Sequence, residues 1–284
     1  MSSSSKLSPG SHATAVNSLT IHYTVLASSP GLPPLIIHPA PWGCGAALYI
    51  QAFSRLSAQY ALIIPSPRGN DSSQRPSSPD EMSSRHLVSD LEQFRQFLGL
   101  DKVSIVGHSS GGTIALGYAI AYPDHVDKLI LLNTDLLGYE RKDNSFFQDV
   151  GQIQARMSVT NDEEFKELVS QILPLYFAHP ERGGPEAFKK VWTNVPSLWA
   201  YGAYYGADKS EDGAWDQVQE LGKVKAKTLV VVGRQDRTCE IEISECVSRG
   251  VTGSRLVVLE DCGHIPWMEQ EKPFWDLLEE FLKE

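Results

Sequence analysis

Cysteine is scarce in this sequence, and its spacing excludes the common cysteine-based sites. The four cysteines are Cys44, Cys239, Cys246 and Cys262. They form no C-x-x-C pair and have no metal-ligand spacing with histidine. We therefore expect no metal and no other cofactor, and we expect reduced thiols, as in an intracellular protein. A disulfide between two of them is the alternative.

The sequence also lacks membrane and nucleic-acid signals. No run approaches ~18 consecutive apolar residues, so no membrane span is expected. The polar N-terminal segment 1–6 has no apolar core of the kind that a secretory signal needs. With 25 basic and 35 acidic residues the net charge is −10, which disfavours nucleic acid and anionic membranes as partners. We expect a cytoplasmic protein that acts on a small-molecule substrate.

Short apolar runs rich in Ile, Val and Leu recur along the chain. Each is too short for a helix and too continuous for a half-exposed strand, which is typical of strands buried on both faces of a parallel sheet. Residues 1–11 are serine-rich and are predicted to be disordered, and residues 15–26 are predicted to form a β-hairpin. The apolar runs are 34–38, 60–64, 103–106, 128–132, 228–232 and 255–259.

Helical patterns alternate with these runs. The clearest covers 80–98, where Ser78 as N-cap, Pro79 at the first position and Glu81 at the third give a start signal, and Gly99 a stop. The alternation predicts an α/β fold with a doubly wound, mostly parallel sheet. Further helices are expected at 110–122, 240–249 and 273–283.

The alternation stops between residues 138 and 222. This stretch contains polar and aromatic segments with helical patterns and no strand-like run, so we expect an inserted helical cap between two parts of the core, 12–137 and 223–284. The helical segments are predicted at 145–157, 162–176, 185–193 and 197–206.

The segment 103–112 carries the strongest functional signal. It reads as a strand, then Gly107-His-Ser-Ser-Gly111, then an apolar helix. In this context a G-x-S-x-G serine sits on a strained turn beside a helix N-terminus, which favours a developing oxyanion. We predict Ser109 as the nucleophile. Ser110 has no glycine two residues before it, and we expect its backbone N–H to bind the oxyanion.

A serine nucleophile needs a base and an acid that orients the base. Asp236 follows the strand-like run 228–232, and His264 follows 255–259 through a short glycine-bearing loop, in the order expected for this motif. We predict Asp236 as the acid and His264 as the base. Asp135, after 128–132, is the rival for the acid.

The second oxyanion donor should lie in the loop after an early strand, at His38-Pro-Ala-Pro-Trp-Gly43. Both prolines lack an N–H, so Ala40 is the predicted donor, and a purely structural proline turn is the alternative. Trp42 is expected to line the site.

The three catalytic segments resemble those of the α/β-hydrolase superfamily. They are Gly107-His-Ser-Ser-Gly111, Gly233-Arg-Gln-Asp236 and Gly263-His264, and the resemblance covers residues 18–284. Within the superfamily the chain is most similar to proline-iminopeptidase-like hydrolases. The similar segments are the 38–43 loop, Pro67-Arg-Gly-Asn-Asp-Ser72 and Leu173-Pro-Leu-Tyr-Phe177. The resemblance implies the α/β-hydrolase fold and hydrolysis through an acyl-enzyme.

Two departures bear on the substrate. The bulky 38–43 loop replaces a glycine block of that family, and Arg237 stands where an acidic residue would suit a substrate amine. The acidic residues that could still bind an amine are Glu211, Asp212, Asp216 and Glu240.

The expected cap is rich in aromatic residues, which favour an apolar acyl substrate if they face the site and otherwise serve packing. Trp42, Trp199 and Tyr205 are the predicted substrate-binding residues. We predict a serine hydrolase of a carboxylic ester or lactone. The alternatives are a proline-iminopeptidase-type aminopeptidase and, more remotely, a slow-turnover ligand receptor. The cap aromatics are Trp192, Trp199, Tyr201, Tyr204, Tyr205 and Trp215.

Overall fold

A computed structural model describes residues 6–141, 145–209 and 214–284. In these residues one sheet of eight strands runs in the order β1-β2-β4-β3-β5-β6-β7-β8. β1 and β2 pair antiparallel, β2 joins β4 antiparallel, and every later pair is parallel. The predicted mostly parallel α/β sheet is therefore confirmed. The strands are β1 Gly10–Val16, β2 Leu19–Leu26, β3 Pro34–His38, β4 Ala61–Pro65, β5 Val103–His108, β6 Val126–Leu132, β7 Lys227–Gly233 and β8 Arg255–Leu259.

The N-terminal segment is more ordered than its composition suggested. β1 begins at Gly10, whose partner on β2 is Val25, and the Tyr23 hydroxyl donates to the Lys6 carbonyl at 3.0 Å. The prediction that residues 1–11 are disordered is wrong for residues 6–11, and residues 1–5 lie outside the described part. An edge strand can pair through its backbone alone, so the polar Ser11 and His12 near its start give no apolar signal.

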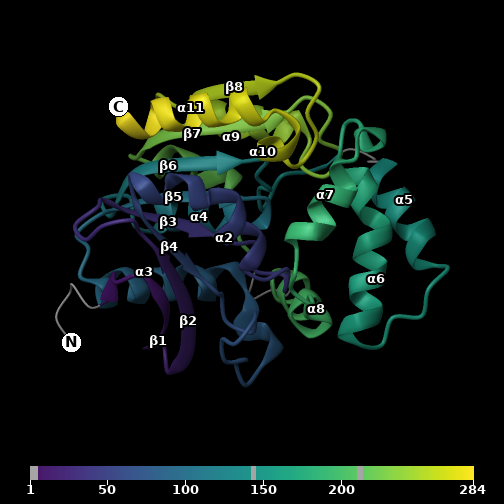
Figure 1. Cartoon of the computed structure of the whole chain (residues 1–284), viewed down its shortest axis with the longest axis horizontal. Coiled ribbons are helices and arrows are strands. Elements are labelled where there is room, and N and C mark those ends of the chain that lie inside the picture. The colour runs from purple at the N-terminus through teal and green to yellow at the C-terminus, as the bar shows by residue number, and fades with distance from the viewer. Residues whose placement is uncertain (1–5, 142–144, 210–213) are drawn as a thin grey trace.

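Helices cover both faces of the sheet because successive residues of the central strands point to opposite sides (Figure 1). On β3, Ile36 packs in the core of one face, and Leu35 and Ile37 pack in the core of the other. The first face is covered by α3 Ser84–Leu98, α4 Ser110–Ala121 and α9 Ile241–Gly250; the second is covered by α2 Ala47–Phe53 and α11 Glu271–Lys283.

The helix expected at 80–98 is broken near its start. Ser78 and Glu81 form the predicted capping box, but on a short 3-10 helix, η2 Pro79–Met82. The chain becomes extended at Ser83, with ψ 152°, before α3 begins. The Ser84 N–H and hydroxyl both donate to the Asp208 carboxylate, at 2.7 and 2.6 Å, so α3 is capped by a residue far along the chain.

The segment between β6 and β7 is helical, and Figure 1 shows its main helices beyond the carboxyl ends of the strands. These ends are where ligands bind in open α/β sheets. The helices are α5 Ser145–Gln154, α6 Asp162–Ile172, η3 Leu173–Tyr176, η4 Pro180–Arg182, α7 Gly184–Val191 and α8 Leu198–Ala207.

The last part of this segment belongs to the core rather than to the cap. η5 Val218–Lys223 contacts α4 and α9, and Trp215 and Leu221 are buried in the core of that face. Residues 215–222, expected in the cap, therefore pack against the sheet layer. The short helices η1 Ser54–Ala58 and α10 Pro266–Glu269 complete the fold.

The structure also bears on the cysteines and on membrane insertion. All four cysteines are free. Among the described ranges, no helix has both the length and the apolar character needed to cross a bilayer.

Candidate active site

Ser109 occupies the turn between β5 and α4. Its φ of 55° and ψ of −130° lie in a region that non-glycine residues rarely adopt, as expected for a strained nucleophile turn. The turn is tight at Gly107, where an added Cβ would lie 2.5 Å from the Gly111 carbonyl oxygen. The Ser109 N–H donates to the Leu132 carbonyl at 3.0 Å, which ties the turn to the end of β6.

Asp236 and His264 meet at the same edge of the sheet. His264 Nδ1 lies 2.8 Å from Asp236 Oδ2, and both side chains are buried. A nitrogen facing a carboxylate carries the proton, so Nδ1–H donates to Asp236 and leaves Nε2 free to act as a base. The predicted contact between these two residues is present.

The Asp236 carboxylate accepts three further hydrogen bonds. The backbone N–H groups of Thr238 and Cys239 donate to Oδ1 at 2.8 and 3.0 Å, and Asn133 Nδ2 donates to Oδ2 at 2.7 Å. These donors fix the orientation of the carboxylate.

Asn133 is a site residue that the sequence reasoning missed. It follows β6 directly, and its side-chain amide also donates to the Gly263 carbonyl at 2.9 Å, beside His264. The available signal is a polar residue at the end of a buried strand. At this strand end we considered Asp135, two residues later, and did not consider Asn133.

Asp135 does not contact His264. Its Oδ1 accepts from Arg141 Nη2 at 2.5 Å and from the Leu136 N–H at 2.8 Å. The geometry therefore places Asp236, and not its rival Asp135, at the histidine.

Two cavities meet at Ser109. The smaller contains about 430 Å³ and is bordered by both Ser109 and His264. The larger contains about 1220 Å³ and is bordered by Ser109 and Ser110. Trp42, Val169 and Tyr176 border both. The larger cavity is lined by apolar and aromatic cap side chains, and polar residues also border it. The apolar and aromatic residues include Phe146, Phe165, Leu168, Ile172, Tyr201 and Tyr205.

The three predicted substrate-binding residues have different outcomes. Trp42 and Tyr205 line the larger cavity. Trp199 does not line either cavity; its ring lies against Gly69 and under the Arg75 guanidinium, 5.0 Å from the ring centre. A role for Trp199 in substrate binding therefore stays a prediction that the cavity linings do not support. Helical spacing alone could not show which face of α8 is turned away from the site.

The predicted oxyanion donors differ in their hydrogen bonds. Within the described residues the Ser110 N–H has no acceptor, and it lies at the N-terminus of α4. The Ala40 N–H instead donates to the Tyr49 hydroxyl at 3.3 Å, a long bond. Ala40 borders the smaller cavity together with Ser109, so its oxyanion role stays a prediction and requires the amide to turn from Tyr49 to the substrate. The Trp42 N–H has no acceptor in the same ranges.

A buried hydrogen-bond chain links the 38–43 loop to the histidine loop. His108 Nε2 lies 2.9 Å from the His264 carbonyl, so it must carry a proton, and Nδ1 then accepts from the Tyr49 hydroxyl at 3.1 Å. Burial and the neighbouring His264 lower the pKa of His108 well below its ordinary value, which keeps the ring neutral. His108 thus packs behind the elbow, and it also connects the two loops.

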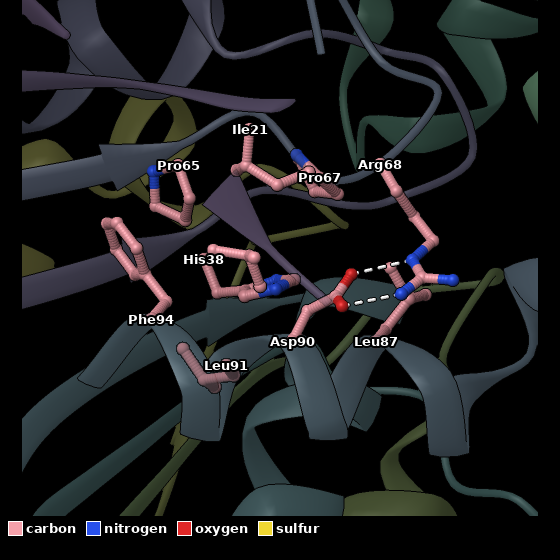
Figure 2. Close-up of a pocket in the computed structure, with 10 residues that line it drawn as sticks. Ile21, His38, Pro65, Pro67, Arg68, Leu87, Asp90, Leu91 and Phe94 are labelled. Carbon is pink, nitrogen blue, oxygen red and sulfur yellow. Dashed lines mark hydrogen bonds and ion pairs between the residues drawn. The ribbon is translucent and has the colours of Figure 1, made fainter. Parts of the chain in front are cut away.

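The segment Pro67–Ser72 supports the 38–43 loop. Asn70 Oδ1 accepts from the Gly43 N–H, and Asn70 Nδ2 donates to the Pro41 carbonyl, both at 2.8 Å. Figure 2 shows the Arg68 guanidinium paired with the Asp90 carboxylate of α3, with bonds of 2.6 and 2.5 Å, and the His38 ring on the other side of Asp90. The cavity in this view is not bordered by Ser109, Asp236 or His264. Arg68, Asp90 and His38 therefore lie outside the candidate site.

Of the acidic residues considered for binding an amine, the two that the structure describes, Asp216 and Glu240, border neither cavity at Ser109. Glu240 borders a different cavity, beside Arg234 and Arg237, and Asp216 Oδ1 accepts from the Gln219 N–H at 3.2 Å. Glu211 and Asp212 lie outside the described residues.

One set of side chains could hold a metal ion. Asp236, Cys239 and His264 each offer a ligand atom, and these atoms lie within 4.8 Å of one another. Two of the three are the hydrogen-bonded acid and base, so a metal there would displace the proton between them.

These features define a hydrolase of the α/β type, and comparison with known proteins agrees. Residues 33–271 match the family model described as alpha/beta hydrolase fold, and the chain belongs to this family.

Named relatives are distant and differ in activity. The chain is 26% identical over 262 residues to monoacylglycerol lipase ABHD6 of Bos taurus, covering 89% of this chain and 76% of that protein. It is 24% identical over 223 residues to the proline iminopeptidase of Saccharolobus solfataricus, covering 74% and 72%. The enol-lactonase structure from Burkholderia xenovorans superposes with a TM-score of 0.76 at 19% identity, covering 96% and 100%. At this identity the structural likeness shows the fold alone.

Proposed function

We propose that this chain is a serine hydrolase that cleaves small-molecule carboxylic esters or lactones through an acyl-enzyme. The observation that carries the proposal is the buried Asp236–His264 pair, 2.8 Å apart, whose histidine borders the same cavity as the strained Ser109. The relative named monoacylglycerol lipase supports an ester substrate.

In the proposed mechanism His264 Nε2 takes the proton of Ser109 as its Oγ attacks the substrate carbonyl. The Ser110 N–H and an amide of the 38–43 loop bind the oxyanion, a contribution that is usually worth ~3 kcal/mol of barrier per donor. His264 then gives its proton to the leaving oxygen, and the acyl group stays on Ser109. Water activated by His264 releases the acid.

The two cavities suit the two parts of an ester. The leaving oxygen must reach His264, which borders only the smaller cavity, so we assign the leaving group to the space of about 430 Å³. The acyl group then enters the larger, mainly aromatic cavity of about 1220 Å³. Its apolar lining favours an uncharged acyl chain over an acyl chain that carries a charge.

The charges near Ser109 argue against a free amine as the group to be bound. Asp135 is the acidic residue that borders the larger cavity, and it is already paired with Arg141, while Lys209 borders the same cavity. A substrate ammonium would therefore meet a neutralised carboxylate and a second cation.

The test compares p-nitrophenyl butyrate with proline p-nitroanilide. We expect hydrolysis of the butyrate ester and no measurable release from the anilide. In the same assay Ser109→Ala should lower kcat by ~10⁶ without loss of folding. The reverse substrate preference, or an ester activity that survives in Ser109→Ala within tenfold, would contradict the proposal.

A further inference from the structure

Two buried hydroxyl groups of residues that line the larger cavity have no hydrogen-bond partner within the described residues. They are Ser110 Oγ and Thr238 Oγ1, and both residues border the larger cavity. A buried hydroxyl without a partner costs free energy, and such groups are rare in folded proteins. Ser110 as a whole is only 2% exposed, so its hydroxyl can be satisfied only from inside the cavity.

Asp135 completes this group. Its N–H donates to the Ser109 carbonyl at 3.3 Å, which places it next to the nucleophile. Arg141 joins Asp135 to Thr238, because its two Nη atoms donate to Asp135 Oδ1 at 2.5 Å and to the Thr238 carbonyl at 2.7 Å. The other carboxylate oxygen, Asp135 Oδ2, accepts no hydrogen bond in the part of the chain that the structure describes.

The chemistry of these three groups selects a ligand. The O–H protons of Ser110 and Thr238 have no acceptor within the described residues, and Asp135 Oδ2 has no donor, so a ligand that satisfies all three carries both an acceptor and a donor. A neutral hydroxyl group does both. Arg141 neutralises Asp135, so the group does not favour a cation.

We propose that Ser110, Thr238 and Asp135 form a polar subsite that binds a hydroxyl group on the acyl part of the substrate, which makes hydroxy-acyl esters the preferred substrate class. This inference rests on the proposed function and adds to it the nature of the acyl group. The aromatic wall of the cavity holds the carbon chain, and the subsite fixes the chain by its hydroxyl.

The experiment compares p-nitrophenyl 3-hydroxybutyrate with p-nitrophenyl butyrate in the wild-type chain and in three variants. The quantity measured is the ratio of the two kcat/KM values. We expect the wild type to prefer the hydroxy ester by about tenfold, the value of one well-formed hydrogen bond. Ser110→Ala and Thr238→Val should each lower this ratio severalfold.

Ser244→Ala is the matched control. Ser244 Oγ is also buried without a partner in the described ranges, but it lies on α9 and borders neither cavity. Its removal should leave the ratio unchanged. If the ratio falls equally in all three variants, the effect comes from the removal of any buried hydroxyl, and this result would contradict the subsite.

Product inhibition gives a measurement that needs no variant. The product 3-hydroxybutyrate should inhibit ester hydrolysis at a concentration about tenfold lower than butyrate does. Equal inhibition, together with a ratio that neither Ser110→Ala nor Thr238→Val changes, overturns the subsite and leaves the ester hydrolase intact. A wild-type chain that hydrolyses neither ester overturns the proposed function itself.

Discussion

Four hydrogen bonds from separate segments of the chain hold the Asp236 carboxylate in place. One comes from His264, one from Asn133 after β6, and two from the backbone of the loop that follows Asp236. An acid held in this way keeps the proton of His264 on Nδ1 and its Nε2 free. The proposed catalysis therefore depends on the charge of Asp236 as well as on its position.

Asp236→Asn tests this dependence. The amide keeps the size of the side chain but offers Nδ1 a donor in place of an acceptor, which favours the wrong tautomer of His264. We expect kcat for p-nitrophenyl butyrate to fall by about 10⁴. Asp135→Asn is the matched control, because Asp135 pairs with Arg141 instead. A larger loss in Asp135→Asn than in Asp236→Asn would show that the acid is assigned wrongly.

Tyr49→Phe tests the buried chain behind the elbow. Loss of the hydroxyl leaves the Ala40 N–H and His108 Nδ1 without their partner. We expect the free energy of unfolding to decrease by about 1–3 kcal/mol in urea titrations. We also expect kcat to fall while KM is unchanged, because the two loops that this chain connects carry the oxyanion donors and the base.

Tyr60→Phe is the control for Tyr49→Phe. Tyr60 is half-buried, and its hydroxyl has no hydrogen bond that the described residues supply. It should leave both stability and kcat close to those of the wild type. Equal effects of the two substitutions would remove the special role of the Tyr49 hydroxyl.

The residues of the candidate site were predictable where a local pattern marks them. Ser109, Asp236 and His264 each follow an apolar strand through a short glycine-bearing turn, and the order of the three is characteristic. Asn133 and Tyr49 carry no such pattern, because their roles arise from contacts with segments more than 50 residues away. The same reason explains Trp199, whose neighbours on the 68–75 segment only the fold reveals.

At the scale of elements, the strands were predicted more closely than the helices. Runs 34–38 and 255–259 match β3 and β8 residue for residue, because a short continuous apolar run marks a strand both in the buried β3 and in β8, which is only partly buried. The break before α3 was missed because its cause lies at the C-terminal end of α8, where Asp208 accepts both bonds from Ser84. Asp208 therefore links the end of the cap helix α8 to the start of α3, one of the helices that cover the first face of the sheet.

Asp208→Ala should remove the hydrogen bonds that link α3 to α8. The buried Ser84 N–H and hydroxyl would lose their acceptor, and we expect the free energy of unfolding to decrease by about 1–3 kcal/mol. Asp276→Ala is the matched control, because Asp276 forms an exposed ion pair with Lys272 on α11. Surface pairs of this kind contribute at most about 1 kcal/mol. If urea titrations give the same small change for both variants, the link between α3 and α8 does not stabilise the fold.

At the scale of the whole molecule, two buried neutral histidines make stability depend on pH. Burial lowers the pKa of His38 from its ordinary value of 6.5 to about 4, and it lowers that of His108 well below the ordinary value. Below pH 6.5 the unfolded chain takes up protons that the folded chain does not. Folded stability is therefore complete above this pH and is lost as the pH falls towards 4.

Urea titrations between pH 7.5 and 4.5 test this expectation. Each histidine should contribute at most about 1.4 kcal/mol per pH unit to the fall in the free energy of unfolding. His38→Gln should make the slope shallower, whereas the same change at His86, which is exposed on α3, should not. A free energy of unfolding that stays constant or rises as the pH falls across this range would contradict the account.

The central claim, that Ser109 is an activated nucleophile, is tested most directly by covalent labelling with a fluorophosphonate and mass spectrometry of the labelled peptides. We predict one adduct per chain, on Ser109, with no adduct in Ser109→Ala and a much slower reaction in Asp236→Asn. An unlabelled wild-type chain, or a label that stays in Ser109→Ala, would show that the strained serine is not the nucleophile.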